Sequence, residues 1–557
     1  SEIEPFWMLI LVRQKTNNSM TTEQKTQSTA HQGVKNQSMS GLDYLRQILH
    51  AKVYQVARET ELTEMTKLSA QLGQRISLKR EDQQPVQSFK IRGAYNKLAH
   101  LVEQQSDQAS LKEVVAASAG NHAQGLALAA RQLNLKATIF MPITTPEIKV
   151  ENVKRLGGNV KLVGKSFDKA QAESVIYANT HGLQLIHPFD DIDVITGQGT
   201  VAKELLQQQP DSDIVFVPVG GGGLLAGMAV YIKQLNPNTK VVGVEAEDSA
   251  CLAAAIKAKK PIDLEHVGLF ADGVAVKRIG EKTFSLIEQY CDEVITVSSD
   301  EICAAIKDIF EQTRVIAEPA GALSLAGLKK YCDDNRDTDK LSESQKMVAI
   351  LSGANMSFHN LRYVSERCEL GEKKEAVLAV TIPEEKGSFR RFCKNLDGRV
   401  ITEFNYRYSN AAAKNNKQAH IFVGVRLGNQ TNERENLVSS LTEANYTVED
   451  LTENELAKLH VRYMIGGNSS ASNNERIFRF QFPEYPGALE NFLDTLGELW
   501  NISLFHYRNH GAAFGQVLAG FEVKPDQQLE FFRHLKQLGY QWQEETNNKA
   551  YTAFLSH

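Results

Sequence analysis

Four consecutive glycines, Gly220 to Gly223, follow the apolar run 214–219 and precede the apolar stretch 224–231. Glycines at a turn from a strand to a helix let backbone N–H groups converge on one point, with no side chains in the way. The positive end of the helix dipole adds to this attraction for an anion. The run therefore predicts a phosphate-binding loop, since a flexible linker would not be flanked by a buried strand and an apolar helix.

The identity of that phosphate stays open from this segment alone. Residues 221–226 fit the pattern G-x-G-x-x-A, and Glu245 ends the apolar run that follows. A glycine pattern with an acid about 20 residues later is the dinucleotide fingerprint, in which the acid binds a ribose hydroxyl. Four glycines in a row suit a compact cup around one phosphate monoester at least as well.

A lysine with unusual neighbours narrows the choice. The segment 85–94 reads Pro-Val-Gln-Ser-Phe-Lys-Ile-Arg-Gly-Ala, in which Lys90 follows Phe89 at what looks like the opening of a helix. An isolated lysine is ordinarily a solvated surface residue. A lysine held in a pocket is what Schiff-base chemistry requires, because its amine must lose a proton before it attacks an aldehyde.

Two more segments carry polar groups at the end of a predicted strand. The first continues through a loop into a helix, and the second ends in a hydroxyl. Residues 114–125 read Val-Val-Ala-Ala-Ser-Ala-Gly-Asn-His-Ala-Gln-Gly, and their loop presents a hydroxyl, a carboxamide and N–H groups. These groups suit a carboxylate ligand. Residues 348–355 read Val-Ala-Ile-Leu-Ser-Gly-Ala-Asn, an apolar strand that ends at Ser352.

Taken together, S-F-K-I-R-G-A, S-A-G-N-H-A-Q-G, V-G-G-G-G-L and L-S-G-A-N resemble the pyridoxal-phosphate enzymes of the tryptophan synthase β fold. Within that group the chain is most similar to the threonine deaminase family of the biosynthetic kind, over roughly residues 41–557 and in the family's order. The stretch after Lys90 reads as the deaminase form. One departure is mild: many relatives have S-G-G-N where this chain has Ser-Gly-Ala-Asn at 352–355.

The resemblance implies a role for each motif. Lys90 would hold pyridoxal 5'-phosphate and act as the base, and Ser352 would face the pyridine nitrogen. The implied cofactor ligands are Lys90, Phe89, Asn121 (on the ring hydroxyl), Gly220, Gly221, Gly222, Gly223, Leu224 and Ser352. The implied receptor for the substrate carboxylate is Ser118, Ala119, Gly120, Asn121 and His122. His122 could be a base, but a residue at a helix start is more often structural.

The hydroxyl of Ser352 favours one reaction class. A carboxylate beside the pyridine nitrogen would keep it protonated and make the ring a strong electron sink, whereas a hydroxyl leaves it neutral. A neutral ring favours prompt loss of a β-substituent, here from L-threonine to give 2-oxobutanoate and ammonia, and from L-serine to give pyruvate. The alternatives are another lyase or racemase of the same fold acting on serine or threonine, a nicotinamide-dependent oxidoreductase, and an amino-acid sensor without catalysis.

Composition fits a cytoplasmic enzyme. The 557 residues carry a net charge of −5 with 42% apolar residues, and no long basic face is visible, which argues against a nucleic-acid partner. No apolar run approaches the ~20 residues needed to span a membrane. The six cysteines are scattered without a Cys/His cluster, so no metal is expected. Residues 1–40 contain a tract rich in Gln, Asn, Ser and Thr, which predicts a disordered tail.

From residue 41 to about 367, strand-like runs alternate with amphipathic stretches of helix length. The runs are 114–117, 137–141, 160–163, 214–219, 241–245 and 348–351, and the clearest helical stretches are 122–133, 147–156, 166–180 and 199–208. Alternation of this kind predicts a parallel α/β sheet with ligands at the carboxyl ends of the strands. The resemblance adds the two-lobed catalytic unit of pyridoxal-phosphate fold type II, with a small mobile lobe near 85–187.

Beyond a predicted linker at 368–374 the chain repeats itself. Residues 383–392 match 483–492, each copy reading strand, proline–glycine turn, helix, strand, strand. This is a ferredoxin-like α+β pattern, and it resembles the ACT-like domains that bind amino acids. We assign these domains to 375–465 and 466–557, with isoleucine as the expected inhibitor, valine as a possible activator and a homotetramer as the assembly. A repeated oligomerisation module without a ligand is the alternative.

Overall fold

The computed structural model describes residues 39–104, 111–336 and 338–554, the last range with gaps at 339–340, 343, 359, 373, 384–387, 407–417, 429–431, 462–473, 484–490, 493–494, 497–499, 501 and 510–513. The predicted tail therefore lies almost wholly outside the described residues. Contacts divide the chain into Ser1–Ser40 and Gly41–His557, and the fold described below is that of the second unit.

A six-stranded sheet forms the larger half of the region before the repeats, with strand order β1-β2-β10-β7-β8-β9. The strands are β1 (Leu62–Glu64), β2 (Arg75–Arg80), β7 (Ile214–Pro218), β8 (Lys240–Ala246), β9 (Glu293–Val297) and β10 (Lys346–Leu351). All neighbours run parallel except β1, which pairs antiparallel with β2 at the sheet edge. The predicted parallel sheet is thus present, with one reversed edge strand.

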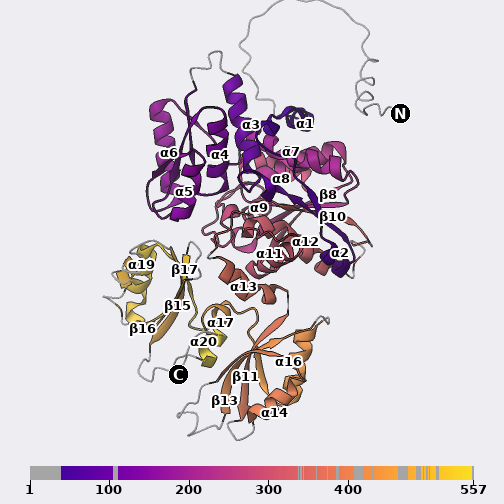
Figure 1. The fold of residues 1–557 in the computed structure, drawn as a ribbon. Coiled ribbons are helices and arrows are strands. Elements are labelled where there is room, and N and C mark those ends of the chain that lie inside the picture. Colours follow the sequence, from indigo (N-terminus) through magenta and orange to yellow (C-terminus); the bar gives the residue numbers. More distant parts are fainter. Residues whose placement is uncertain are drawn as a thin grey trace, which may run out of the picture. The chain divides into compact units, whose positions relative to one another are not determined.

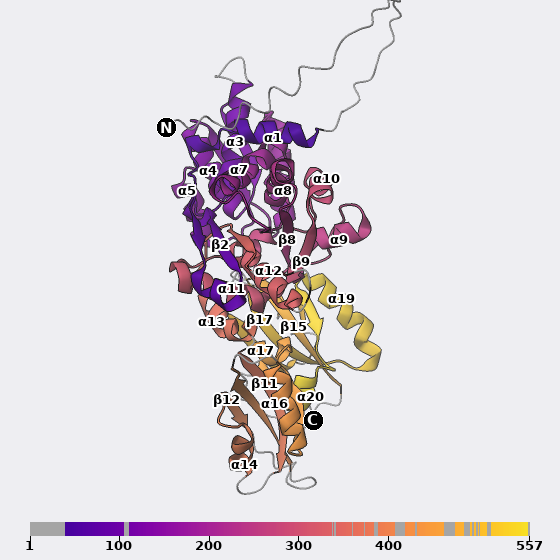
Figure 2. The same ribbon diagram turned by 90° about the vertical axis from the view of Figure 1, so that its right-hand side faces the viewer.

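Helices of the larger half pack against this sheet and against one another. Figure 2 shows α9 (Cys251–Ala258) beside β9 and α10 (Glu281–Tyr290) beside α8, and contacts join both pairs. Contacts join α12 to β7, β8 and β10, and join α7, α8 and α1 to one another. Their bounds are α1 (Gly41–His50), α7 (Ile192–Gln208), α8 (Gly223–Leu235), α11 (Ser299–Thr313), α12 (Pro319–Asn335) and α13 (Asn360–Gly371); a short helix, α2 (Thr66–Leu72), follows β1.

A second, all-parallel sheet of four strands, in the order β5-β4-β3-β6, lies within residues 113–185. Its strands are β3 (Glu113–Ala117), β4 (Lys136–Met141), β5 (Asn159–Leu162) and β6 (Gln184–Leu185). Figure 1 shows α4 (Asn121–Gln132), α5 (Glu147–Arg155) and α6 (Phe167–His181) grouped beside α3 (Lys90–Glu103). Helix α3 contacts both α4 and α7, so it joins the two sheets.

The C-terminal part contains two more four-stranded sheets, ordered β12-β13-β11-β14 and β16-β17-β15-β18 and antiparallel throughout. The first comprises β11 (Glu375–Pro383), α14 (Ser388–Asn395), β12 (Ile401–Tyr406), β13 (Gln418–Arg426), α16 (Glu433–Glu443) and β14 (Thr447–Asp450). The second comprises β15 (Glu475–Pro483), β16 (Ile502–Asn509), β17 (Phe514–Glu522), α19 (Gln528–Leu538) and β18 (Gln541–Glu544). This is the ferredoxin-like arrangement. Short helices α17 (Glu455–Leu459) and α20 (Lys549–Phe554) follow the two sheets.

The structure differs from the sequence prediction at two boundaries. Helix α13 continues through Gly371, so only the second half of the predicted linker 368–374 is left to connect it to β11. Leu370 holds this last turn in place, because it is buried in a cluster with Val377 and Leu456. Helix α7 begins at Ile192 rather than near residue 199. Asp191 caps this start by accepting from two backbone N–H groups. The proline–glycine turns of both repeats lie largely outside the described residues.

A buried ion cluster joins α11 and α13 to α17 of the first repeat. The Arg367 side chain bonds Asp300 and also donates to Glu455 at 2.7 and 3.1 Å. Lys458 donates to the other oxygen of Asp300 at 2.8 Å. Arg367 and Lys458 are 5% and 6% exposed. Two cations from different elements thus share one carboxylate away from solvent. No helix among the described residues is long and apolar enough to cross a membrane.

Candidate active site

The segment before Lys90 is bonded to the loop that carries Ser352. Ser88 forms an antiparallel bridge with Gly353, and the Phe89 N–H donates to the Ser352 carbonyl at 3.2 Å. The Ala354 N–H donates to the carbonyl of Gln87 at 2.9 Å. These bonds hold Gln87 at φ +54°, a left-handed backbone conformation that residues other than glycine rarely adopt. Motifs more than 250 residues apart in the chain are therefore one piece of local structure.

Lys90 starts α3 and points toward the segment that precedes α7. Its Nζ donates to the carbonyl of Pro188 at 3.0 Å and lies 5.2 Å from the centre of the Phe89 ring. Burial lowers the pKa of Lys90 to about 8, and the nearby Glu318 carboxylate opposes part of that shift. An amine with this pKa is partly neutral near neutral pH, as a nucleophile or a base must be.

The glycine loop lies between β7 and α8, next to this lysine. Gly222 has φ +87°, and a Cβ on Gly221 would lie 2.2 Å from the ring of Phe189. The Thr283 hydroxyl donates to the Gly221 carbonyl at 2.8 Å, which turns that carbonyl away from the loop's N–H groups. Leu224 is buried in the first turn of α8. Because Phe189 follows the residue that accepts from Lys90, the loop and the lysine share one neighbour.

Asn121 begins α4 with its carboxamide held at both ends. Its Nδ2 donates to Glu318 Oε1 at 2.6 Å, and its Oδ1 accepts from Asn355 Nδ2 at 2.7 Å. Helix α4 crosses α3 so closely that a Cβ at Gly125 would lie 3.1 Å from the carbonyl carbon of Lys90. Asn121 is thereby positioned against both the lysine and the Ser352 loop.

The predicted carboxylate receptor is a partly exposed loop between β3 and α4. Ser118, Ala119 and Gly120 are neither buried nor fully exposed, and Ser118 Oγ accepts from the Gly120 N–H at 3.3 Å. A partly exposed loop with N–H groups at the start of a helix remains available to an anionic ligand.

His122 and Ser352 are both buried, but their surroundings indicate different roles. His122 Nε2 faces the carbonyl of Ile186 at 3.4 Å, and burial lowers its pKa to about 3. A base that weak favours the structural role that its helix position predicts. Ser352 is 4% exposed, and its hydroxyl donates to the carbonyl of Ala320 at 3.2 Å. A neutral pyridine nitrogen only accepts, so this hydroxyl would bind it by turning its hydrogen away from the Ala320 carbonyl.

Glu245, the acid of the dinucleotide fingerprint, has a different task. Its two oxygens accept from the N–H groups of Leu252 and Ala253 at 2.7 and 2.8 Å, which caps the start of α9. The side chain is fully buried. Because the carboxylate is occupied by its own fold, it does not serve as a ribose ligand, and the phosphate-monoester interpretation of the glycine loop is the better one.

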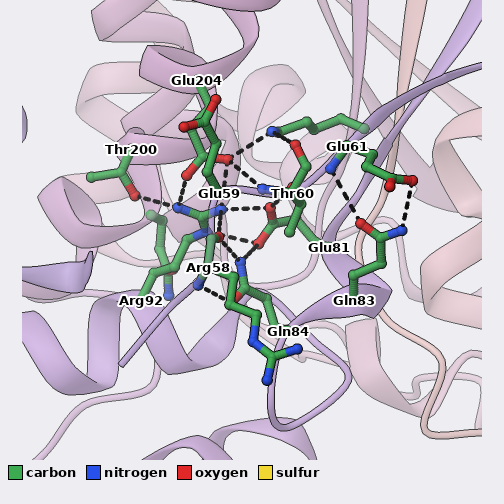
Figure 3. Close-up of polar contacts among 12 residues, drawn as sticks. Arg58, Glu59, Thr60, Glu61, Glu81, Gln83, Gln84, Arg92, Thr200 and Glu204 are labelled. Atoms are coloured by element: carbon green, nitrogen blue, oxygen red, sulfur yellow. Dashed lines mark hydrogen bonds and ion pairs between the residues drawn. The ribbon is translucent and has the colours of Figure 1, made fainter. Parts of the chain in front are cut away.

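Two residues after Lys90, the Arg92 guanidinium lies between two buried carboxylates (Figure 3). It donates twice to Glu81 at 2.7 Å and twice to Glu204 at 2.6 and 2.9 Å. Lys79 Nζ donates to Glu204 at 2.7 Å and to the carbonyl of Thr60 at 2.7 Å. All these charged side chains are at most 1% exposed. The network ties the first turn of α3 to α7 and β2, and so fixes where Lys90 lies.

Sequence reasoning missed Glu318, Asn355 as a ligand of Asn121, and the Pro188–Phe189 segment. A signal for Glu318 exists: the stretch Ala317-Glu318-Pro319 places an acid directly before a proline at a helix start. Nothing comparable marks Phe189, whose place follows from the path of the chain between β6 and α7.

These residues fit pyridoxal phosphate. A lysine with a lowered pKa can form a Schiff base, the glycine loop offers N–H groups to one phosphate, Asn121 offers a donor, and Ser352 offers a hydroxyl that is compatible with a neutral pyridine nitrogen. Among the described residues, no group of three or more His, Cys, Asp or Glu side chains could hold a metal ion.

Comparison with known proteins defines the class first. Residues 53–353 match the family described as pyridoxal-phosphate dependent enzyme. Among solved structures, the processed form of threonine deaminase isoform 2 from Solanum lycopersicum is similar over 59% of this chain and 88% of its own, with 45% identity and a TM-score of 0.56. Maize serine racemase is similar over 59% of this chain and 98% of its own, with 33% identity and a TM-score of 0.53. The catalytic region is a pyridoxal-phosphate enzyme of fold type II.

The particular family follows from the whole length. Residues 366–461 and 466–555 each match the C-terminal regulatory domain of threonine dehydratase. The biosynthetic L-threonine dehydratase IlvA of Escherichia coli (strain K12) is 55% identical over 93% of this chain and 98% of its own. The mitochondrial threonine dehydratase of Saccharomyces cerevisiae is 47% identical over 92% of this chain and 89% of its own. The chain belongs to the biosynthetic threonine dehydratases, which are carbon–nitrogen lyases.

Proposed function

We propose that this chain converts L-threonine to 2-oxobutanoate and ammonia, by eliminating water and then adding water back as the product enamine hydrolyses; this step commits threonine carbon to isoleucine. The observation that carries the proposal is the arrangement around Lys90. A partly neutral lysine lies beside a glycine loop, a carboxamide donor and a buried serine hydroxyl. Close similarity to biosynthetic threonine dehydratases over nearly the whole chain supports threonine as the substrate.

Pyridoxal phosphate, when bound, supplies a conjugated ring that lowers the cost of removing the Cα proton. The chain's residues do the rest. The glycine loop 220–223 and Leu224 would hold its phosphate through backbone N–H groups, and Asn121 would donate to its ring hydroxyl. Phe89 lies beside the lysine, with its ring centre 5.2 Å from Lys90 Nζ. Lys90 takes the Cα proton at Nζ, because its lowered pKa lets it exist as a neutral amine. At the pyridine nitrogen Ser352 would supply a hydroxyl rather than a carboxylate, and the neutral ring would favour loss of the β-hydroxyl. The released enamine then hydrolyses to the keto acid and ammonia.

The loop 118–122 binds the substrate carboxylate in this scheme, through its N–H groups and the Ser118 hydroxyl. L-serine is the second substrate and yields pyruvate. One methyl group in an apolar pocket contributes only about 1–3 kcal/mol to discrimination. We therefore expect a preference for threonine of roughly ten- to a hundredfold in kcat/KM rather than exclusion of serine.

We further propose that the C-terminal pair of domains senses isoleucine, with valine opposing it, in a homotetramer. The match of both repeats to regulatory domains supports this. The ion cluster of Asp300, Arg367, Glu455 and Lys458 provides a physical connection, because it joins a helix of the catalytic region to the first repeat. Coupling between such sites is typically about 1–3 kcal/mol. The cytoplasm remains the predicted location.

One assay tests the catalytic proposal. Purified protein with pyridoxal phosphate and L-threonine should release 2-oxobutanoate and ammonia in equal amounts, and Lys90→Ala should lower turnover at least a thousandfold while the protein still folds. Lys154→Ala is the matched control, since Lys154 forms an exposed pair with Glu151 one turn away on α5. Retention of a tenth of the activity in Lys90→Ala would refute the role of Lys90. Formation of a D-amino acid in place of keto acid would favour the racemase alternative.

A further inference from the structure

Glu318 is a buried carboxylate for which the reaction described above has no use. It directly precedes α12, is 5% exposed, and its oxygen accepts from Asn121 Nδ2 at 2.6 Å. An acid at this position ordinarily caps its own helix, but the Glu318 side chain makes no capping bond. The fold also leaves room for it, because a Cβ on Gly353 would lie 2.2 Å from Glu318 Oε1. A carboxylate that is buried, and turned away from its own helix, has a partner elsewhere that justifies its desolvation.

That partner is the Asn121 amide, and two bonds determine which way round it lies. Asn355 Nδ2 donates to the Val86 carbonyl at 2.9 Å and to Asn121 Oδ1 at 2.7 Å. Because a backbone carbonyl only accepts, the nitrogen of Asn355 must face Val86, and the oxygen of Asn121 must then face Asn355. Asn121 Nδ2 is left facing Glu318, with one of its two N–H groups on the carboxylate.

We propose that Glu318 is a positioning residue for the cofactor: its carboxylate holds the Asn121 amide so that a nitrogen donor, not an oxygen acceptor, faces the ring hydroxyl of pyridoxal phosphate. The inference rests on the role proposed for Asn121. A donor at that place stabilises the deprotonated ring oxygen, whereas an acceptor would repel it. Glu318 thus acts through Asn121 on the electronic state of the bound ring, without touching the substrate.

The environment of Glu318 is consistent with such a role. Burial raises its pKa to about 7, and Asp272 adds to the rise, while the Asn121 bond and the nearby cations Lys149 and Lys90 oppose it. Helix α12 also supplies the Ala320 carbonyl that accepts from Ser352 at 3.2 Å. The start of α12 therefore orients the residues proposed for the ring hydroxyl and for the ring nitrogen.

The test compares Glu318→Ala, Glu318→Gln, Asn121→Ala and the double variant, using the dissociation constant of pyridoxal phosphate and the pH titration of its bound absorbance band. Glu318→Ala should weaken cofactor binding at least tenfold and shift the band's titration by at least half a pH unit. Glu318→Gln, which keeps an acceptor for Asn121 Nδ2, should recover most of the affinity. Glu113→Ala is the control, since it removes another partly buried carboxylate, held by Thr138 and Lys136.

The double variant separates action through Asn121 from a general effect. If Glu318 works through Asn121, adding Glu318→Ala to Asn121→Ala should change the dissociation constant less than twofold. Full multiplication of the two effects, or a Glu318→Ala spectrum equal to that of the wild type, would overturn the proposal. Neither result would affect the proposed reaction, which is judged separately by keto acid formed from threonine by the wild-type protein.

Discussion

Lys90 owes its reactivity to its surroundings rather than to its type. Burial lowers its pKa from 10.5 to about 8, while Lys149, beside Asp272, has its pKa raised. Both lysines lie near Glu318, yet only Lys90 becomes an amine that can lose its proton at moderate pH. Their pKa values move in opposite directions because burial without a close ion pair dominates at Lys90, whereas the charge of Asp272 dominates at Lys149.

This shift predicts how the cofactor-free protein recovers its cofactor. The neutral form of Lys90 is the nucleophile, and its fraction rises with pH until the pH passes the pKa. With a pKa of about 8, the rate of reconstitution with pyridoxal phosphate should rise about tenfold from pH 7 to pH 9 and then level off. Stopped-flow absorbance measures this rate. A rate still rising steeply at pH 10 would mean that the lysine keeps its ordinary pKa.

Ser352 carries a second prediction at this scale. Its hydroxyl is buried and donates to the Ala320 carbonyl. In Ser352→Asp a carboxylate should keep the pyridine nitrogen protonated, stabilise a carbanion and slow elimination at least tenfold relative to exchange of the Cα proton. Proton exchange into deuterated water, followed by NMR beside keto-acid release, gives the ratio, and Ser352→Ala controls for loss of the hydroxyl alone. An unchanged ratio in Ser352→Asp would show that residue 352 does not face the ring.

Among the elements, the pattern of apolar residues predicted the apolar buried strands well. It did not predict a strand that buries charged side chains. The runs expected at 114–117, 137–141 and 241–245 are β3, β4 and β8 to within a residue or two at each end. Strand β2 escaped notice because its sequence, Arg-Ile-Ser-Leu-Lys-Arg, has no apolar run. Its Lys79 is fully buried only because Glu204, far along the chain, pairs with it. Pairings of this kind cannot be read from local sequence.

The same limit applies to the site. Three motifs were visible because each joins a strand end to glycine, hydroxyl or amide groups. The lysine motif was visible because its amine stands at the opening of a helix. The structure brings them together. Phe189 carries no sequence signal, and the signal at Glu318 marks only an acid before a helix, because the importance of both residues depends on contacts with Gly221 and Asn121 that arise only after folding. At Glu245 the opposite happened: its spacing from the glycines fits a ribose ligand, but the carboxylate caps the start of α9.

The buried network around Arg92 makes a prediction at the scale of elements. Glu204→Gln removes the carboxylate shared by Arg92 and Lys79, so both buried cations lose part of their compensating charge. We expect the free energy of unfolding to fall by about 3–5 kcal/mol. The first calorimetric transition should fall by at least about 5 °C. Glu103→Gln, which breaks only a largely exposed pair with Lys52, should cost less than about 1 kcal/mol. Equal stability of the two variants would show that the network does not anchor α3.

At the scale of the whole molecule, buried charges connect the catalytic region to the first repeat. The first repeat reaches α11 and α13 through the cluster of Asp300, Arg367, Glu455 and Lys458. Arg367 and Asp300 both precede Lys373 and the first strand of the repeats, β11. Removing the repeats therefore leaves that pair together, so the truncated protein keeps a partner for the buried Asp300.

Ending the chain at Lys373 should thus leave an active enzyme with a hyperbolic dependence on threonine and no response to isoleucine. Full-length protein should show sigmoidal dependence that isoleucine sharpens, because an effector bound outside the active site acts through a coupling free energy. Initial rates across threonine and isoleucine concentrations decide the matter. Inhibition of the truncated protein with the full-length midpoint would place the sensor in the catalytic region.

The proposed chemistry requires Lys90 to be the residue that holds pyridoxal phosphate. Reduction of the reconstituted protein with borohydride, followed by digestion and mass spectrometry, would identify the modified lysine. We predict that the label is found on the peptide containing Lys90 and is absent from the peptide containing Lys149, its charged neighbour beside Asp272. A label on Lys149, or on any lysine other than Lys90, would contradict the assignment of the site.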